Sequence, residues 1–210
     1  MYGEGKMHND YGRGFYCTED LELAKEWACP DGQDGFANQY RLDTDSLSCM
    51  DLGSKNYNIL NWMAMLVENR VFDISYPIAA QGKRYLLDHF LPDYKNYDII
   101  KGYRADDSYF SFAKDFISNT ISLEQLSRAM RLGKLGEQVV LKSKKAFDAV
   151  QFERDKCEYA DSSIYFPLRE KRDSEARTQY LSVERYNDIV NGLFMRDIMG
   201  RNMKNEDFSR

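Results

Sequence analysis

The stretch at residues 9–18, N-D-Y-G-R-G-F-Y-C-T, constrains the fold more than any other part of the chain. Gly12 and Gly14 leave the backbone without Cβ atoms at alternate positions, so a ligand or another strand can approach closely. Phe15 and Tyr16 point to opposite faces if they lie on a strand. We expect Phe15 to face a core and Tyr16 to present its ring to whatever the glycines admit. Such a stretch is more often a hairpin with a packed tyrosine than a nucleotide pocket, because isolated glycine motifs are weak evidence.

Length, charge and cysteine spacing limit the number of domains and the kinds of ligand that we expect. The 210 residues suggest one domain, or one domain with an appendage. The net charge of −5 gives no basic surplus that would favour stable nucleic-acid binding. The sequence has no signal-peptide pattern and no apolar run that could cross a bilayer, so we expect a cytoplasmic protein without a membrane anchor. The four cysteines and two histidines have no ligand spacing, which argues against a zinc site.

Hydrophobic periodicity predicts helices and strands in mixed order. Helices are expected over residues 18–29, 57–70, 77–91, 109–116, 122–132 and 180–199, with a short helix or turn at 143–149. Strands are expected over residues 36–42, 48–52, 97–103, 138–142 and 150–157. Thr18 is predicted to be the N-cap of the first helix, and Ser122 with Gln125 has the spacing of a capping box. The elements do not follow a regular βαβ order, so we predict an α+β fold.

The C-terminal part reads differently from the rest. The charged run at residues 169–177 is typical of a solvated helix or linker. We therefore divide the chain into a domain at residues 1–167 and a linker with an amphipathic helix at residues 168–210. That helix is expected to pack in the core or to form a homodimer contact, and less readily to dock on a partner helix. The last residues are expected to be frayed.

Two further clusters carry candidate chemistry. In G-Y-R-A-D-D-S-Y (102–109), Arg104 ends a strand and suits a phosphate or carboxylate, whereas Asp106 and Asp107 more readily cap the next helix. In L-G-K-L-G-E-Q-V-V-L-K (132–142), Glu137 or Gln138 begins a strand behind two glycines. A carboxylate there can stabilise positive charge on a sugar carbon or orient a ribose hydroxyl, and an exposed turn glutamate is the alternative. No Ser-His-Asp or Cys-His arrangement is supported.

These clusters together resemble a known bacterial family. The matching runs are the opening stretch with A-K-E-W-A (24–28), L-V-E-N-R (66–70), Y-D-I-I-K-G-Y-R-A-D-D-S-Y-F (97–110) and K-L-G-E-Q-V-V-L-K-S (134–143). They resemble proteins with an ADP-ribosyltransferase-like fold that are usually toxins encoded beside a small antitoxin. The resemblance covers residues 9–152. It implies a split β-sheet core with surrounding helices, and it leaves the C-terminal helix outside as an appendage.

The resemblance also implies a substrate and roles for residues. NAD would be cleaved at its nicotinamide–ribose bond, and ADP-ribose would pass to a protein, a nucleic acid or water, the last making the enzyme an NAD glycohydrolase. Tyr16 matches the aromatic residue that stacks on nicotinamide, and Glu137 or Gln138 takes the position of the catalytic carboxylate. A glutamine there cannot neutralise charge. The implied NAD-binding residues are Gly12, Arg13, Gly14, Phe15, Tyr16, Arg104 and Asp106.

The sequence departs from the family at its start. Members usually open with a strand that carries a histidine followed by glycine, and this histidine contacts the ribose. Here the chain begins Met1-Tyr2-Gly3, and His8 stands too close to Tyr16 to replace that histidine. Without the first strand, we expect weakened or abolished NAD chemistry and an unpaired sheet edge. A catalytically inactive module that binds a nucleotide or a partner is therefore the alternative to an active toxin.

Overall fold

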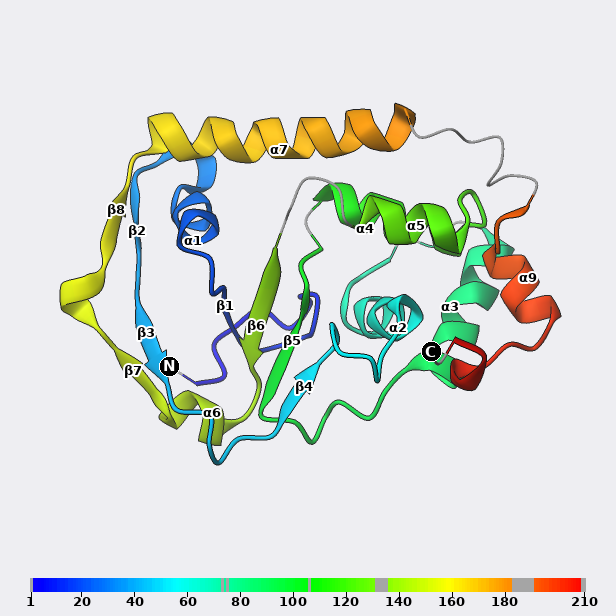
Figure 1. Ribbon diagram of the computed structural model, residues 1–210, viewed down its shortest axis with the longest axis horizontal. Coiled ribbons are helices and arrows are strands. Elements are labelled where there is room, and N and C mark those ends of the chain that lie inside the picture. The colour runs from blue at the N-terminus through cyan, green and yellow to red at the C-terminus, as the bar shows by residue number, and fades with distance from the viewer. Residues whose placement is uncertain are drawn as a thin grey trace.

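The computed structural model describes residues 2–72, 74, 76–105, 107–130, 136–182 and 191–208. A four-stranded sheet lies in the middle of the molecule, with most helices on one side and a long two-stranded ribbon on the other (Figure 1). Helix α7 (Ser162–Ser182) runs along one end of both parts. The fold is α+β, as the irregular order of the elements predicted.

The central sheet has the strand order β1-β6-β5-β4. Its strands are β1 (Phe15–Cys17), β4 (Cys49–Asp51), β5 (Ile99–Tyr103) and β6 (Glu137–Leu141). β6 is antiparallel to both neighbours, whereas β4 and β5 are parallel. Tyr16 pairs with Val140 and Gly102 with Gln138. Because directly paired residues share a face, Tyr16 and Gln138 lie on one face, and Phe15 and Glu137 lie on the other.

The ribbon consists of two short strand pairs that follow each other (Figure 1). β2 (Gly35–Ala37) pairs with β8 (Glu158–Ala160), and β3 (Tyr40–Leu42) pairs with β7 (Val150–Phe152). The predictions of single strands over 36–42 and 150–157 are therefore wrong. The 3₁₀ turn η3 (Arg154–Lys156) interrupts the second strand, and Glu153 at this point forms ion pairs with Arg41 and Lys156.

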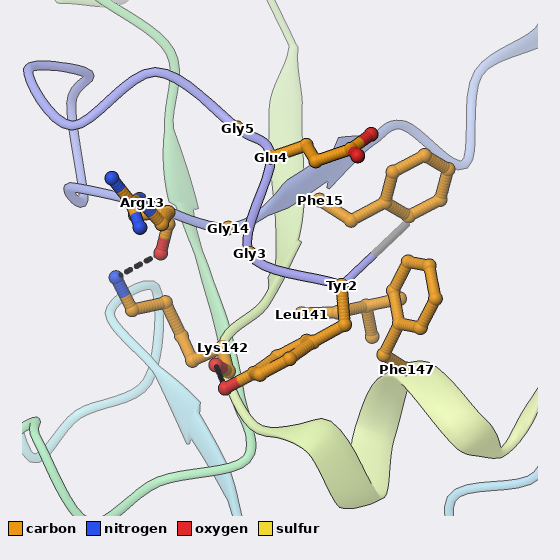
Figure 2. Close-up of a pocket in the computed structure, with 10 residues that line it drawn as sticks. All are labelled: Tyr2, Gly3, Glu4, Gly5, Arg13, Gly14, Phe15, Leu141, Lys142 and Phe147. Atoms are coloured by element: carbon orange, nitrogen blue, oxygen red, sulfur yellow. Dashed lines mark hydrogen bonds between the residues drawn. The ribbon is translucent and has the colours of Figure 1, made fainter.

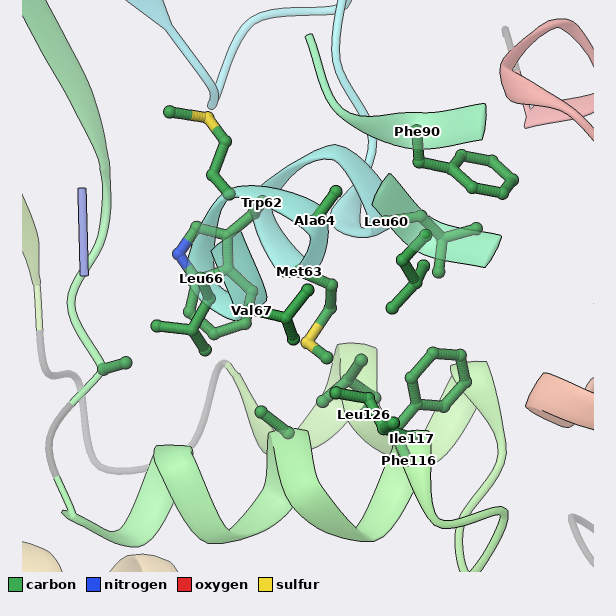
Figure 3. Close-up of a cluster of buried hydrophobic side chains, with 14 of the residues drawn as sticks. Leu60, Trp62, Met63, Ala64, Leu66, Val67, Phe90, Phe116, Ile117 and Leu126 are labelled. Atoms are coloured by element: carbon green, nitrogen blue, oxygen red, sulfur yellow. The ribbon is translucent and has the colours of Figure 1, made fainter. Parts of the chain in front are cut away.

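Helices cover the face of the sheet that carries Tyr16. They are α2 (Ile59–Asn69), α3 (Pro77–Phe90), α4 (Asp107–Ile117), α5 (Leu123–Ala129) and α9 (Met195–Gly200). Residues 60–67 of α2 are all buried, because α2 lies between the sheet and the other helices (Figure 3). The capping box of Ser122 and Gln125 is confirmed.

The opposite face of the sheet carries a smaller core. Ile99, Leu141 and Ala146 form its centre, and Phe15 is among the side chains that pack against it. Helix α6 (Lys144–Asp148) closes this side, at the predicted short helix. Helix α1 (Leu21–Ala28) and the turn η1 (Pro30–Gly32) connect β1 to the ribbon. The N-cap of α1 is Asp20 and not Thr18, since the Asp20 carboxylate accepts the Glu22 and Leu23 amides.

The C-terminal predictions need two corrections. A continuous helix over 180–199 is wrong, because residues 192–194 are not helical and residues 183–190 lie outside the described part. The backbone of Leu193 bonds to Leu123 and to the Glu124 carboxylate, which holds it against the start of α5. Residues 203–208 are not frayed either, because η4 (Asn205–Phe208) places the Phe208 ring 5.7 Å from that of Phe90; residues 209 and 210 lie outside the described part.

Helix α7 continues through residues 167 and 168, where the sequence predicts a domain boundary. That boundary stays a prediction. Among the helices that the structure describes, none combines the length and the apolar character that a membrane crossing requires.

Candidate functional site

Asp10, in the loop before β1, is the centre of the most unusual polar cluster. Its side chain is almost completely buried, at 3% exposure. Oδ2 accepts hydrogen bonds from the Ala105 amide at 2.9 Å and from Gln138 Nε2 at 2.8 Å. Oδ1 accepts none from any described residue, and Arg70 Nη1 lies 3.6 Å from it. Burial raises the pKa of Asp10 against the lowering effect of these bonds and of Arg70. A buried carboxylate oxygen without a hydrogen-bond donor is rare in folded proteins, which makes Asp10 a candidate site residue.

Gln138 belongs to this cluster, where its side chain holds neighbouring groups in place through hydrogen bonds. Its amide donates to Asp10 Oδ2 and, at 3.2 Å, to the carbonyl oxygen of Tyr103. The same carbonyl also accepts from Tyr11 Oη at 2.7 Å and from Trp62 Nε1 at 3.2 Å. Both amide hydrogens of Gln138 are thus used to hold the loop of Asp10 against the end of β5.

Tyr16 closes the glycine loop on itself. Its hydroxyl donates to the Gly12 carbonyl at 2.7 Å and accepts the Tyr11 amide at 3.0 Å. Burial raises the pKa of Tyr16. The ring packs against the large core, because pairing with Val140 turns it to the helical side. We expected Tyr16 to face an opening and Phe15 to face a core. In the structure, Phe15 does pack against a core, the smaller one, and also lines a pocket, whereas Tyr16 packs against the large core instead of facing an opening.

The two glycines admit parts of the protein itself. A Cβ on Gly14 would lie 2.5 Å from Val140 Cγ1 and 2.9 Å from the Leu141 carbonyl oxygen. Gly12 has a φ of +73°, and a Cβ there would lie 2.5 Å from Asn69 Oδ1. Of the two alternatives that the sequence left open, close approach of another strand is the one observed at Gly14.

Arg104 extends the cluster towards α1. Its guanidinium carbon lies 5.0 Å from the centre of the Trp27 ring, within the range of a cation–π contact. The positive charge of Arg104 lowers the pKa values of both Asp10 and Glu26. Trp27 Nε1 is buried and has no hydrogen-bond acceptor among the described residues. We call Asp10, Arg70, Arg104 and Trp27 the Asp10 site.

Glu137 lies elsewhere. Its side chain is on the opposite face of the sheet from Gln138, is 43% exposed, and has its Oε2 3.3 Å from Lys101 Nζ. Lys101 also contacts Glu19 at 2.7 Å, and both carboxylates raise the pKa of Lys101. The structure therefore does not bring Glu137 together with Tyr16 and Gln138. Asp106 lies outside the described residues.

Three other predicted residues line a separate pocket of about 400 Å³ (Figure 2). They are Arg13, Gly14 and Phe15. The predicted ligand residues are thus divided between this pocket, the surroundings of Asp10, and the exposed end of β6. Sequence reasoning missed Asp10, Arg70 and Trp27 as site residues, although each lies in one of the runs that carried the family resemblance.

Lys142 lines the pocket and is half-buried, and desolvation lowers its pKa to about 8 from its ordinary 10.5. Glu4 and Arg13 line the same pocket, and the Lys142 ammonium group donates to the Tyr11 and Arg13 carbonyls. Between these two pKa values the unfolded chain binds more protons at this residue than the folded chain, so stability rises with pH there. Below about pH 8 the cost of burying the charged amine is fully present.

We therefore expect wild type to gain stability relative to Lys142→Met between about pH 8 and about pH 10.5. Urea unfolding of both proteins across this range measures the difference in their free energies of unfolding. The contributions of groups that titrate in both proteins cancel in this difference. A difference that does not change with pH would contradict the burial of this amine.

A protein-family model described as "Protein of unknown function (DUF3990)" matches residues 1–152. No curated protein matches the chain, and no solved structure does. The matched region contains the whole central sheet and all four residues of the Asp10 site, and it ends before β8 and α7.

Proposed function

The chain belongs to the DUF3990 family, and from that premise we propose that it is an ADP-ribosyltransferase-like protein that binds NAD at the Asp10 site. The single observation that carries this proposal is the buried Oδ1 of Asp10, which has no donor among the described residues. Ribose hydroxyls and the nicotinamide carboxamide are donors that such an oxygen accepts.

The neighbours of Asp10 suit the rest of a dinucleotide. Arg70 and Arg104 supply positive charge, and guanidinium groups bind phosphates through two parallel hydrogen bonds. Trp27 offers an aromatic surface and an indole N–H that has no described acceptor. Polar donors, cations and an aromatic ring at one place are the chemistry that a ribose, a diphosphate and a flat ring require.

The geometry favours binding without turnover. Cleavage of the nicotinamide–ribose bond needs a carboxylate beside the sugar carbon that becomes positive. Gln138 is the residue on the face of Tyr16, and its amide is already bonded to Asp10 and Tyr103. We therefore propose the nucleotide-binding module, the sequence-based alternative, as the primary form of this function.

An active transferase or NAD glycohydrolase is the second candidate, and the exposure of Glu137 favours it. Glu137 is the one carboxylate at the start of β6, and Lys101 holds it in place. In this form the protein would act in the cytoplasm as a toxin with a small antitoxin partner. Nicotinamide release by wild type that is abolished in Glu137→Gln would support this candidate over the binding module.

The binding proposal is tested by titrating NAD into the purified chain in a calorimeter. We expect Arg104→Gln to weaken NAD binding by about tenfold or more, because a charged hydrogen-bond donor to phosphate is lost. Arg41→Gln is the matched control, because Arg41 is 66% exposed on the distant ribbon and pairs with Glu153. Equal affinities of Arg104→Gln and wild type, or no heat up to about 1 mM NAD, would reject the Asp10 site.

A further inference from the structure

The pocket at the edge of the central sheet has an aromatic side. Tyr2, Phe15 and Phe147 line it, and they come from the N-terminal segment, β1 and α6. The ring centres of Phe15 and Phe147 are 6.0 Å apart, and those of Tyr2 and Phe147 are 5.9 Å apart. The Tyr2 hydroxyl donates to the Lys142 carbonyl at 3.3 Å, which ties this ring to the end of β6. The Phe147 ring contacts each of the other two, so the three rings form one aromatic cluster.

The pocket also has a cationic side. Figure 2 shows Arg13 and the Lys142 amine on one side of Gly3 and Gly14, and the rings of Phe15 and Phe147 on the other. Lys142 Nζ donates to the Arg13 carbonyl at 2.7 Å and to the Tyr11 carbonyl. An ammonium group has three hydrogens, so one remains after these two bonds. No carboxylate of the described residues forms an ion pair with Lys142.

We propose that this pocket binds a small anion joined to a planar ring, of the chemical class of the nucleoside monophosphates. The base packs on the Tyr2, Phe15 and Phe147 rings, and the phosphate lies beside Lys142 and Arg13. The half-buried Lys142 ammonium, which has no counter-ion among the described residues, gains from such an anion, because partial burial strengthens the attraction. Of the three glycines that line the pocket, Gly3 is the one that borders open space, because a Cβ there would meet nothing within 4 Å, and the sugar belongs beside it.

Glu4 sets the direction of the ligand. Figure 2 shows its carboxylate beside the Phe15 ring, away from the Lys142 amine. A carboxylate on that side repels a phosphate and accepts hydrogen bonds from the amino group of a base. The anion therefore belongs at the Lys142 end. The aromatic side of the pocket is separate from the Asp10 site, because Phe15 lies on the opposite face of the sheet from Tyr16 and Gln138, whereas the Lys142 amine bonds to the Tyr11 carbonyl next to Asp10.

The test is a calorimetric titration of the full chain with AMP, adenosine and inorganic phosphate as separate probes. We expect AMP to bind at least about tenfold more tightly than adenosine or inorganic phosphate. Raised salt is expected to weaken the binding of AMP more than the binding of adenosine. Lys142→Met and Phe147→Leu are expected to weaken AMP binding about tenfold. Lys144→Met is the matched control, because Lys144 is 69% exposed and pairs with Asp148.

Three outcomes would overturn the proposal. One is AMP binding that Phe147→Leu, Arg13→Gln and Lys142→Met leave unchanged, and another is the absence of AMP binding up to about 1 mM. The third is loss of AMP binding in Arg104→Gln, which would place the nucleotide at the Asp10 site instead. If Lys142→Met does not fold, Phe147→Leu and Arg13→Gln decide alone, since neither side chain donates a hydrogen bond that the structure records within the pocket.

Discussion

Trp62→Ala is expected to lower the free energy of unfolding by about 3–5 kcal/mol. Trp62 is 1% exposed on α2, in the layer between the sheet and the other helices (Figure 3). Its indole N–H donates to the Tyr103 carbonyl at 3.2 Å, and its ring meets the Tyr103 ring edge-on at 6.2 Å. Truncation removes the buried apolar surface and leaves a cavity that the packed helices cannot close.

Urea unfolding monitored by circular dichroism measures this loss. Trp62→Phe is the informative comparison, because it keeps an aromatic ring and removes the N–H donor. We expect it to cost about 1–3 kcal/mol, since the Tyr103 carbonyl keeps its bonds from Tyr11 and Gln138. If Trp62→Ala lost no more than Trp62→Phe, the ring would not be buried as the structure shows.

Gly14→Ala is expected to lower the free energy of unfolding by about 1–3 kcal/mol, and more if β1 separates from β6. The added Cβ would lie 2.5 Å from Val140 Cγ1 and 2.9 Å from the Leu141 carbonyl oxygen. The Leu141 carbonyl is backbone of the central strand β6 and cannot move aside without disturbing its neighbours. The cost therefore comes from the spacing of the two strands.

Gly200→Ala is the control for the general effect of replacing a glycine. A Cβ on Gly200, at the end of α9, meets nothing within 4 Å. Alanine is favoured over glycine in helices, so this change is expected to be neutral or stabilising. Thermal unfolding of both variants measures the loss of stability. Comparable losses in Gly14→Ala and Gly200→Ala would refute close packing of β1 on β6.

The glycines also explain why the opening motif misled the sequence analysis about the site. Alternate glycines indicate only that some group approaches the backbone closely, and the pattern does not identify that group. The approaching group at Gly14 is β6, which is distant in sequence. Its register then decides which way Phe15 and Tyr16 point, because a shift of one residue exchanges the two faces of a strand.

Elements that depend on local periodicity were predicted well. α2 and α3 carry apolar stripes at helical spacing and were found within two residues of the expected ends. The capping box at Ser122 was confirmed because both of its partners lie within four residues of each other. Local chemistry was enough in these places.

Elements that depend on partners far along the chain were predicted poorly. The break in the ribbon lies at Glu153 and the turn η3, where Glu153 forms an ion pair with Arg41 of the other strand. The break before α9 follows from the bonds of Leu193 to the start of α5. No window of neighbouring residues contains both partners of such contacts, so periodicity continued the helix and the strands through them.

The sequence by itself determined the α+β class, most of the helices and strands, and the runs in which the site residues lie. Only the tertiary structure decided that Asp10, Arg70, Arg104 and Trp27 gather at one place, and that Glu137 and Gln138, adjacent in sequence, face opposite sides of the sheet. The physical reason is that side-chain direction on a strand is set by its register with neighbouring strands, and this register depends on contacts between residues more than a hundred positions apart.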